Sequence, residues 1–223
     1  KMIKIQPEID ASYADHISKG NSSLDKRDYE KALERAERLM SLASEFEFPH
    51  YIAYARIMRG FAKAKLGSVN RGIDEMVNGL KARRDTGAEL VRPMFLTMLA
   101  EVLLDADQLS WGLETLDEVN SIIANNNERW LESESQRMRG LVLEQQNPGN
   151  KEAVICLKKA LKTARAFGSV NLEIRVLVSL IKLKKQYAHH DNQSSDLLTR
   201  LANLHEGLPE EISSIDRQQS YEL

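Results

Sequence analysis

The sequence of 223 residues contains one cysteine and no large excess of either charge. A lone Cys156 excludes an intrachain disulfide and argues against a metal site built on cysteines. The 31 basic and 33 acidic side chains leave a formal net charge of −2, so the whole chain has no general attraction for polyanions. We therefore predict neither a nucleic-acid partner nor a membrane partner.

Long apolar runs are also missing. No run approaches the roughly 18 residues that cross a bilayer. The opening residues, Lys1-Met2-Ile3-Lys4, lead directly into a polar and charged stretch, unlike a signal peptide. A cytoplasmic location is the resulting prediction.

Small residues recur at a spacing of about 40 residues within helix-like stretches. Gly20, Gly60 and Gly140 stand 40 or 80 residues apart, and Ala100 fills the remaining place. Glycine inside a helix costs about 1 kcal/mol relative to alanine. Its recurrence therefore predicts places where two helices touch. A second set of small residues follows in each unit: Ala32, Gly72, Gly112 and Ala153.

Each repeat reads as helix A, a short turn and helix B. In the second repeat the helices are predicted over residues 49–66 and 69–86, with an apolar stripe through Ile73, Met76, Val77 and Leu80. Helix ends are predicted at Gly87, Asn127 and Gly168, and the turn at residues 147–150 is predicted to be one residue longer than its counterparts.

No stretch alternates like a strand, so the predicted class is all-α. We predict a single domain over residues 1–223, a right-handed superhelix of five repeats and a C-terminal capping helix. The repeats are placed at about 9–47, 48–87, 88–127, 128–168 and 169–207, and the cap at 208–223.

The second repeat resembles the tetratricopeptide pattern. Gly60, Ala62, Gly67, Gly72 and Gly79 occupy the key places of that pattern. The period departs from it, since tetratricopeptide units have about 34 residues and these have about 40. The resemblance implies longer helices.

A second resemblance is carried by residues 54–60, 86–93, 99–101, 128–132, 137–140 and 172–175. Through them, residues 28–205 are similar to the long-repeat C-terminal region of multidomain bacterial signalling proteins. These carry an ATPase of the MalT/LuxR-like regulator kind, or a nucleotide cyclase with such an ATPase, ahead of the repeats. The resemblance implies a C-terminal fragment that serves as an interaction or regulatory module, with any ATPase, cyclase or DNA-binding part upstream.

No residue pattern indicates catalysis. Residues 67–72 have the glycine spacing of a phosphate loop, but Ile73 and Asp74 replace its Lys and Ser/Thr, so an inter-helix turn is favoured. His189-His190-Asp191 is interpreted as a solvated loop, and Cys156 as a buried, inert thiol. We predict no catalytic, cofactor or metal residues, and hence no enzyme activity in this chain.

The arginines at positions 56, 59, 83 and 84 are interleaved with acidic residues. We interpret them as a mixed solvated surface, not as a nucleic-acid patch.

In tetratricopeptide domains the A helices line a concave groove that binds a partner. Transferring the groove positions by register predicts contacts that are part apolar and part charged, suited to a protein or peptide. For Arg137 two readings stay open: a partner contact, or a structural pair with Glu134 and Glu101. The predicted contacts are Tyr54, Ile57, Phe61, Met94, Thr97, Glu101, Glu134, Arg137 and Leu141.

The sequence thus favours a non-catalytic module that binds a protein or the upstream domains of its own chain. Two alternatives remain: an inducer-sensing domain of a MalT-like regulator, and the regulatory part of a nucleotide cyclase.

Overall fold

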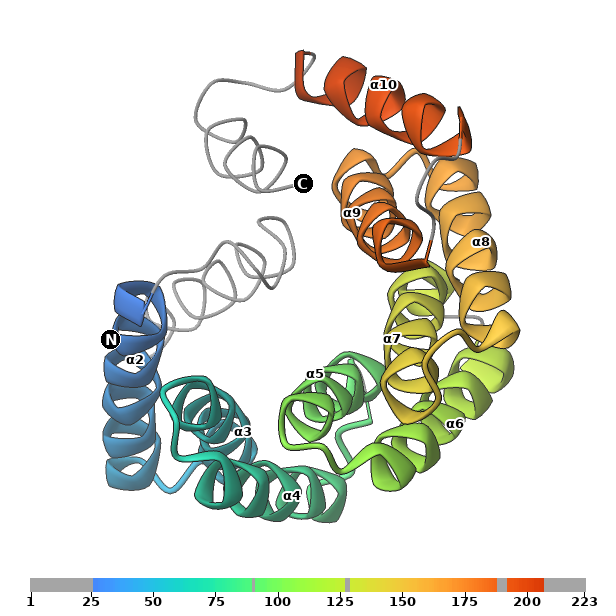
Figure 1. Ribbon diagram of the computed structural model, residues 1–223. Helices are drawn as coiled ribbons and strands as arrows, with labels where there is room; N and C mark the ends of the chain where they lie inside the picture. Colours follow the sequence, from blue (N-terminus) through green and yellow to red (C-terminus); the bar gives the residue numbers. More distant parts are fainter. Residues whose placement is uncertain (1–25, 90, 127–128, 188–191, 207–223) are drawn as a thin grey trace. The chain divides into compact units, whose positions relative to one another are not determined.

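A computed structural model describes residues 26–89, 91–126, 129–187 and 192–206 (Figure 1). These residues form α-helices and one short 3₁₀ helix, and they contain no strand, so the predicted all-α class is confirmed for them. The predicted cap at 208–223, Asn127 and the His189-His190-Asp191 stretch lie outside the described residues. The elements in chain order are α2 (Lys26–Glu45), α3 (Pro49–Lys65), α4 (Val69–Asp85), α5 (Arg92–Asp105), α6 (Leu109–Asn126), η1 (Arg129–Leu131), α7 (Glu132–Gln146), α8 (Lys151–Ala166), α9 (Val170–Tyr187) and α10 (Asn192–Glu206).

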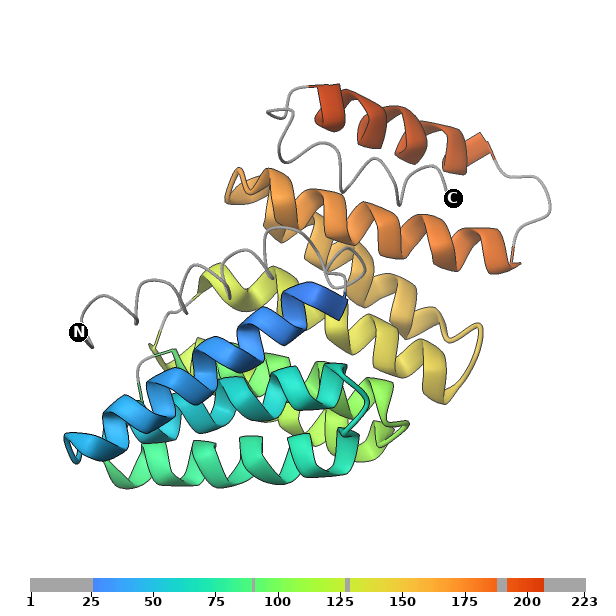
Figure 2. The same ribbon diagram turned by 90° about the vertical axis from the view of Figure 1, so that its left-hand side faces the viewer.

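The helices pack consecutively within two compact units. In the first unit, which ends at Val119 within α6, α3 packs on α2, α4 and α5. In the second unit, which starts at Asn120, α8 packs on α7 and α9, and α10 runs beside α9 (Figure 2). Each unit is described below by itself.

The boundaries of α3 and α4 follow local signals in the sequence. Pro49 occupies the first turn of α3, where its missing N–H costs nothing. Gly67 follows the end of α3 and has φ of 97°, a left-handed conformation that suits glycine. The predicted ranges 49–66 and 69–86 therefore agree with α3 and α4 to within one residue.

The turn between α7 and α8 is longer than that between α3 and α4, as predicted. It covers residues 147–150, whereas the α3–α4 turn covers 66–68. Gly149 has φ of 82°, and the side chain of Asn150 accepts a hydrogen bond from the Glu152 N–H at 2.9 Å. This cap satisfies one of the free N–H groups at the start of α8.

Small residues let α3 and α4 approach each other closely. A Cβ placed on Gly72 would lie 2.5 Å from the carbonyl oxygen of Gly60, and one on Gly60 would lie 2.7 Å from that of Gly72. A Cβ on Gly140 of α7 would lie 2.9 Å from Cγ of Leu157 in α8. The predicted helix–helix contacts at Gly60 and Gly140 are confirmed.

Three helices are buried on nearly all sides. Every residue of α5 from Arg92 to Leu103 is buried, and the same holds in α9 from Glu173 to Ile181. In α7 the buried run covers residues 133–138. By contrast, α4 and α8 each bury one face and expose the other. The buried helices therefore enclose polar side chains that the rest of the protein must satisfy.

Candidate functional site

The residues predicted to contact a partner are almost all buried within the chain. Leu141 alone among the nine is partly exposed. Side chains buried in this way offer a partner little surface, and their role as partner contacts stays a prediction. The buried ones are Tyr54, Ile57, Phe61, Met94, Thr97, Glu101, Glu134 and Arg137.

In the first unit the predicted aromatic contacts pack against neighbouring helices. Tyr54 meets Phe95 of α5 edge-to-face, with ring centroids 5.6 Å apart, and Phe61 meets Tyr29 of α2 at 6.3 Å. Both arrangements are favourable for aromatic pairs. Ile57 lies against Gly79, where an added Cβ would come within 2.6 Å of it. Ile57 therefore belongs to the core between α3 and α4.

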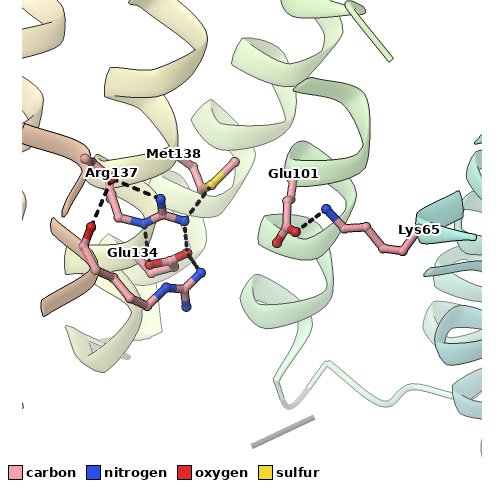
Figure 3. A network of polar contacts seen from close by, with 7 residues as sticks. Lys65, Glu101, Glu134, Arg137 and Met138 are labelled. Atoms are coloured by element: carbon pink, nitrogen blue, oxygen red, sulfur yellow. Dashed lines mark hydrogen bonds and ion pairs between the residues drawn. The ribbon is translucent and has the colours of Figure 1, made fainter. Parts of the chain in front are cut away.

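Charged residues join α3 to α5. Lys65 forms an ion pair with Glu101, which Figure 3 shows, and a second one with Asp105 at 2.5 Å. Burial alone would lower the pKa of Lys65, but the two carboxylates outweigh it and raise that pKa to about 12. Nearby, the Thr97 hydroxyl donates to the carbonyl oxygen of Pro93 in its own helix at 2.8 Å. The Lys65 group thus fixes the ends of two adjacent helices.

A second charged network lies in the other unit, between α7 and α9. Arg137 donates two hydrogen bonds to Glu134, from Nε at 3.0 Å and from Nη2 at 2.8 Å, and Figure 3 shows the two side chains facing each other beside Met138. Arg175 of α9 pairs with the same carboxylate at 2.8 Å. Arg137 also donates to the hydroxyl of Ser179 at 3.3 Å. One carboxylate therefore bridges arginines of two helices.

This geometry favours the structural reading of Arg137. Its side chain is 7% exposed and holds Glu134 in a two-point, charge-assisted contact. Glu101 belongs to the first unit, where it pairs with Lys65.

A buried guanidinium marks the junction of α3, α4 and α5. Arg83, at the end of α4, is 4% exposed and lies over the ring of Phe95 at 5.2 Å. Its Nη1 lies 3.3 Å from Nε2 of His50. A guanidinium can only donate, so His50 accepts through an unprotonated Nε2. Burial, and then the charge of Arg83, lower the pKa of His50.

The interpretation of the arginines as a solvated surface was wrong for Arg83, which is buried. It holds for Arg84, which is exposed and pairs with Glu118 at 3.4 Å. Arg56 and Arg59 are half-buried, and Arg59 pairs with Glu75 at 2.7 Å. A charge pattern along the sequence does not show which arginine lies beneath its neighbours.

The other residues that the sequence singled out for chemistry lie in the core or in a turn. Cys156 is buried as predicted, and burial raises the pKa of its thiol. Residues 67–72 cover the α3–α4 turn and the first turn of α4. Within the described residues, no group of three or more His, Cys, Asp or Glu side chains could hold a metal ion. In the same part of the chain, no helix combines the length and the apolar character needed to cross a bilayer.

No family model matches the chain, and no curated protein matches it at a significant level.

The sequence analysis did not predict that the helices carrying the proposed groove contacts are buried, nor that charged residues such as Glu101, Glu134 and Arg137 are buried with them. The signal was present in α5, whose sequence RPMFLTMLAEVLLD is apolar around most of its circumference. A helix of this kind is typical of a protein interior. The same signal is weaker in α7, which is rich in polar residues and yet buried.

Proposed function

We propose that the chain is a helical-repeat module of the tetratricopeptide-like kind that binds a protein partner or other domains of its own chain. Its repeats of about 40 residues form a right-handed solenoid, and it serves a bacterial signalling or transcription-regulating protein in the cytoplasm without catalysing a reaction itself. The resemblance of residues 28–205 to the repeat region of MalT/LuxR-like regulators supports this proposal.

The observation that carries the proposal is that two ion pairs join residues separated by one predicted repeat length. Lys65 and Asp105 are 40 residues apart and form an ion pair between α3 and α5. Glu134 and Arg175 are 41 residues apart and do the same between α7 and α9. Contacts between equivalent positions are what stacking of similar units produces.

Stacked helix pairs suit recognition of extended or helical protein segments. Each pair adds a rigid, regularly spaced surface, and an array of them presents an extended face to a partner.

The proposal is tested by selecting peptides from a displayed library of helical and extended sequences on the immobilised chain. We expect enriched peptides that bind the folded chain with micromolar Kd or better by calorimetry. Gly72→Leu is expected to unfold the first unit, and Gly140→Leu the second. Binding should disappear in the variant whose unit holds the site.

Two results would overturn the proposal. In the first, no peptide is enriched, and a nucleotide or sugar raises the melting temperature of the chain in a ligand screen. That result would favour the inducer-sensing alternative. The other is turnover of a nucleotide by the purified chain, which would make it an enzyme.

A further inference from the structure

The exposed face of α8 carries a dense row of positive charge. At 3.6 residues per turn, five cations of this helix fall within an arc of about 120°. The opposite arc, with Ala153, Leu157 and Ala160, is buried against α7 and α9 (Figure 1). The cations of the exposed arc, called here the α8 basic face, are Lys151, Lys158, Lys159, Lys162 and Arg165.

Few acids balance this face. Glu152 is the acidic residue of α8 itself and lies at the rim of the arc. From neighbouring helices, Glu132 reaches Lys159 at 3.6 Å and Glu173 reaches Arg165 at 2.8 Å. Within the described residues, Lys151, Lys158 and Lys162 form no ion pair. The α8 basic face therefore retains a net positive field at the surface.

An apolar side chain stands in the middle of the row. Ile155 is 63% exposed, the highest value among the large apolar side chains of the described residues. It lies one turn after Lys151 and one turn before Lys158 and Lys159. A lone exposed isoleucine is ordinary, but one surrounded by lysines provides an anchor for an apolar residue of a bound partner.

We infer that the α8 basic face binds an acidic segment of a protein partner, as a helix or an extended peptide that has carboxylates spaced along it and an apolar residue over Ile155. This inference rests on the proposed protein-binding function and names a surface and a partner chemistry for it. The row from Lys151 to Arg165 extends about 21 Å at 1.5 Å per residue, which is the length of about four turns of a helix.

A protein carboxylate fits this face better than a nucleic acid. Lys159 and Arg165 already pair with carboxylates of this chain, so the geometry for such pairs exists at both sides of the row. Five cations in a straight line provide a smaller footprint than the roughly six to ten phosphate contacts of a typical DNA-binding surface. The exposed Ile155 has no counterpart in a phosphate backbone. The net charge of −2 also gives the chain no long-range attraction to a polyanion.

The test uses the full chain and a labelled 15-residue helical peptide with Glu at positions 1, 4, 8, 11 and 15 and Leu at position 5. A matched peptide has Gln in place of every Glu, and a 15-nucleotide single-stranded DNA serves as a polyanion. Affinity is measured by fluorescence anisotropy at about 50 mM and about 300 mM salt, where screening of exposed charges differs strongly.

The variant to compare is Lys151→Ser/Lys158→Ser/Lys162→Ser. Its control is Arg38→Ser/Arg71→Ser/Lys81→Ser, which makes the same change of net charge at exposed positions of α2 and α4. Circular dichroism verifies that both variants are folded, and all six positions are exposed, so both should fold.

We expect the α8 variant to bind the Glu peptide at least tenfold more weakly and the control variant to bind within twofold of the wild type. The Gln peptide should bind at least tenfold more weakly than the Glu peptide, and Ile155→Ser should weaken the Glu peptide about threefold or more.

Equal losses in the α8 and control variants would overturn the inference, as would equal binding of the two peptides. Tighter binding of the DNA than of the Glu peptide, with loss in the α8 variant, would overturn it in favour of a nucleic-acid surface. Peptides obtained by library selection that bind the α8 variant normally would refute the α8 site while leaving the proposed protein-binding function intact.

Discussion

Replacing Gly72 by alanine tests the close contact of α3 and α4. The added methyl group would lie 2.5 Å from the Gly60 carbonyl oxygen and 2.8 Å from the Ala64 backbone nitrogen. Both atoms belong to the backbone, so no side-chain rotation relieves the overlap and the helices must separate. Overpacking costs about 1–3 kcal/mol and occasionally more. The higher helix propensity of alanine offsets about 1 kcal/mol of this cost. Because the overlap is with backbone atoms, we take the upper end of that cost, and we expect a net loss of about 2 kcal/mol in the free energy of unfolding.

Two other glycines provide graded controls for this substitution. Gly67→Ala introduces no contact within 4 Å but forces alanine to adopt φ of 97°, which costs about 1–2 kcal/mol. Gly140→Ala places the methyl group 2.9 Å from Cγ of Leu157, a side chain that can shift, and 3.0 Å from the carbonyl oxygen of Ala153. After the gain in propensity we expect a cost of about 0–1 kcal/mol.

The assay is urea unfolding followed by tryptophan fluorescence, one unit at a time. Trp111 belongs to the first unit and Trp130 to the second. A Trp130→Phe background therefore reports the unit that contains Gly72, and a Trp111→Phe background reports the unit that contains Gly140. Free energies come from linear extrapolation. A cost for Gly72→Ala below that for Gly67→Ala would refute the argument from backbone contact.

Three further predictions concern buried or strained groups. Arg137→Ala should lower the free energy of unfolding of the second unit by about 1.5–3 kcal/mol, because Glu134 loses its two charge-assisted hydrogen bonds from Arg137 but keeps Arg175 as a cation partner; a cost below about 1 kcal/mol in urea unfolding would contradict this. Lowering the pH from 7 to 5 should destabilise the wild type more than His50→Gln. Because burial and Arg83 lower the folded pKa of His50, its contribution is present above the unfolded pKa of about 6.5 and lost below it; parallel urea midpoints in the two proteins would exclude this role. Val91→Gly should leave the free energy of unfolding unchanged or raise it by up to about 1 kcal/mol, because Val91 has φ of 56°; a thermal unfolding midpoint lowered by several degrees would contradict this.

The helix boundaries could be predicted because they depend on local chemistry. Pro49 suits only the first turn of a helix, and Gly67 adopts a backbone angle that other residues avoid. Gly72 and Gly140 indicated helix contacts because glycine destabilises a helix interior, and a close contact with another helix offsets that cost. None of these inferences depends on how the helices are arranged beyond their nearest neighbours.

The surface positions could not be predicted in the same way. Transfer from a 34-residue pattern assumes that each side of a helix faces the same neighbour as in that pattern. The predicted spacing of about 40 residues departs from it, and extra residues in a helix change which side is covered. Ile57 illustrates this, because it packs on Gly79 of α4. Arg83 illustrates a second limit, because its burial depends on residues of other helices, such as His50 and Phe95, that the local charge pattern does not place.

Total charge concealed the distribution of charge among the helices. The sequence of α8 has five cations against one acid, whereas that of α6 has three acids, Glu114, Asp117 and Glu118, and no cation. Opposite excesses on separate helices cancel in a sum of −2, although each produces its own local field. Because these fields are screened within about 10 Å at 0.1 M salt, a partner responds to the helix that it touches and not to the sum. The low net charge therefore argues against long-range attraction of a polyanion, and it is fully compatible with short-range recognition of carboxylates by the α8 basic face.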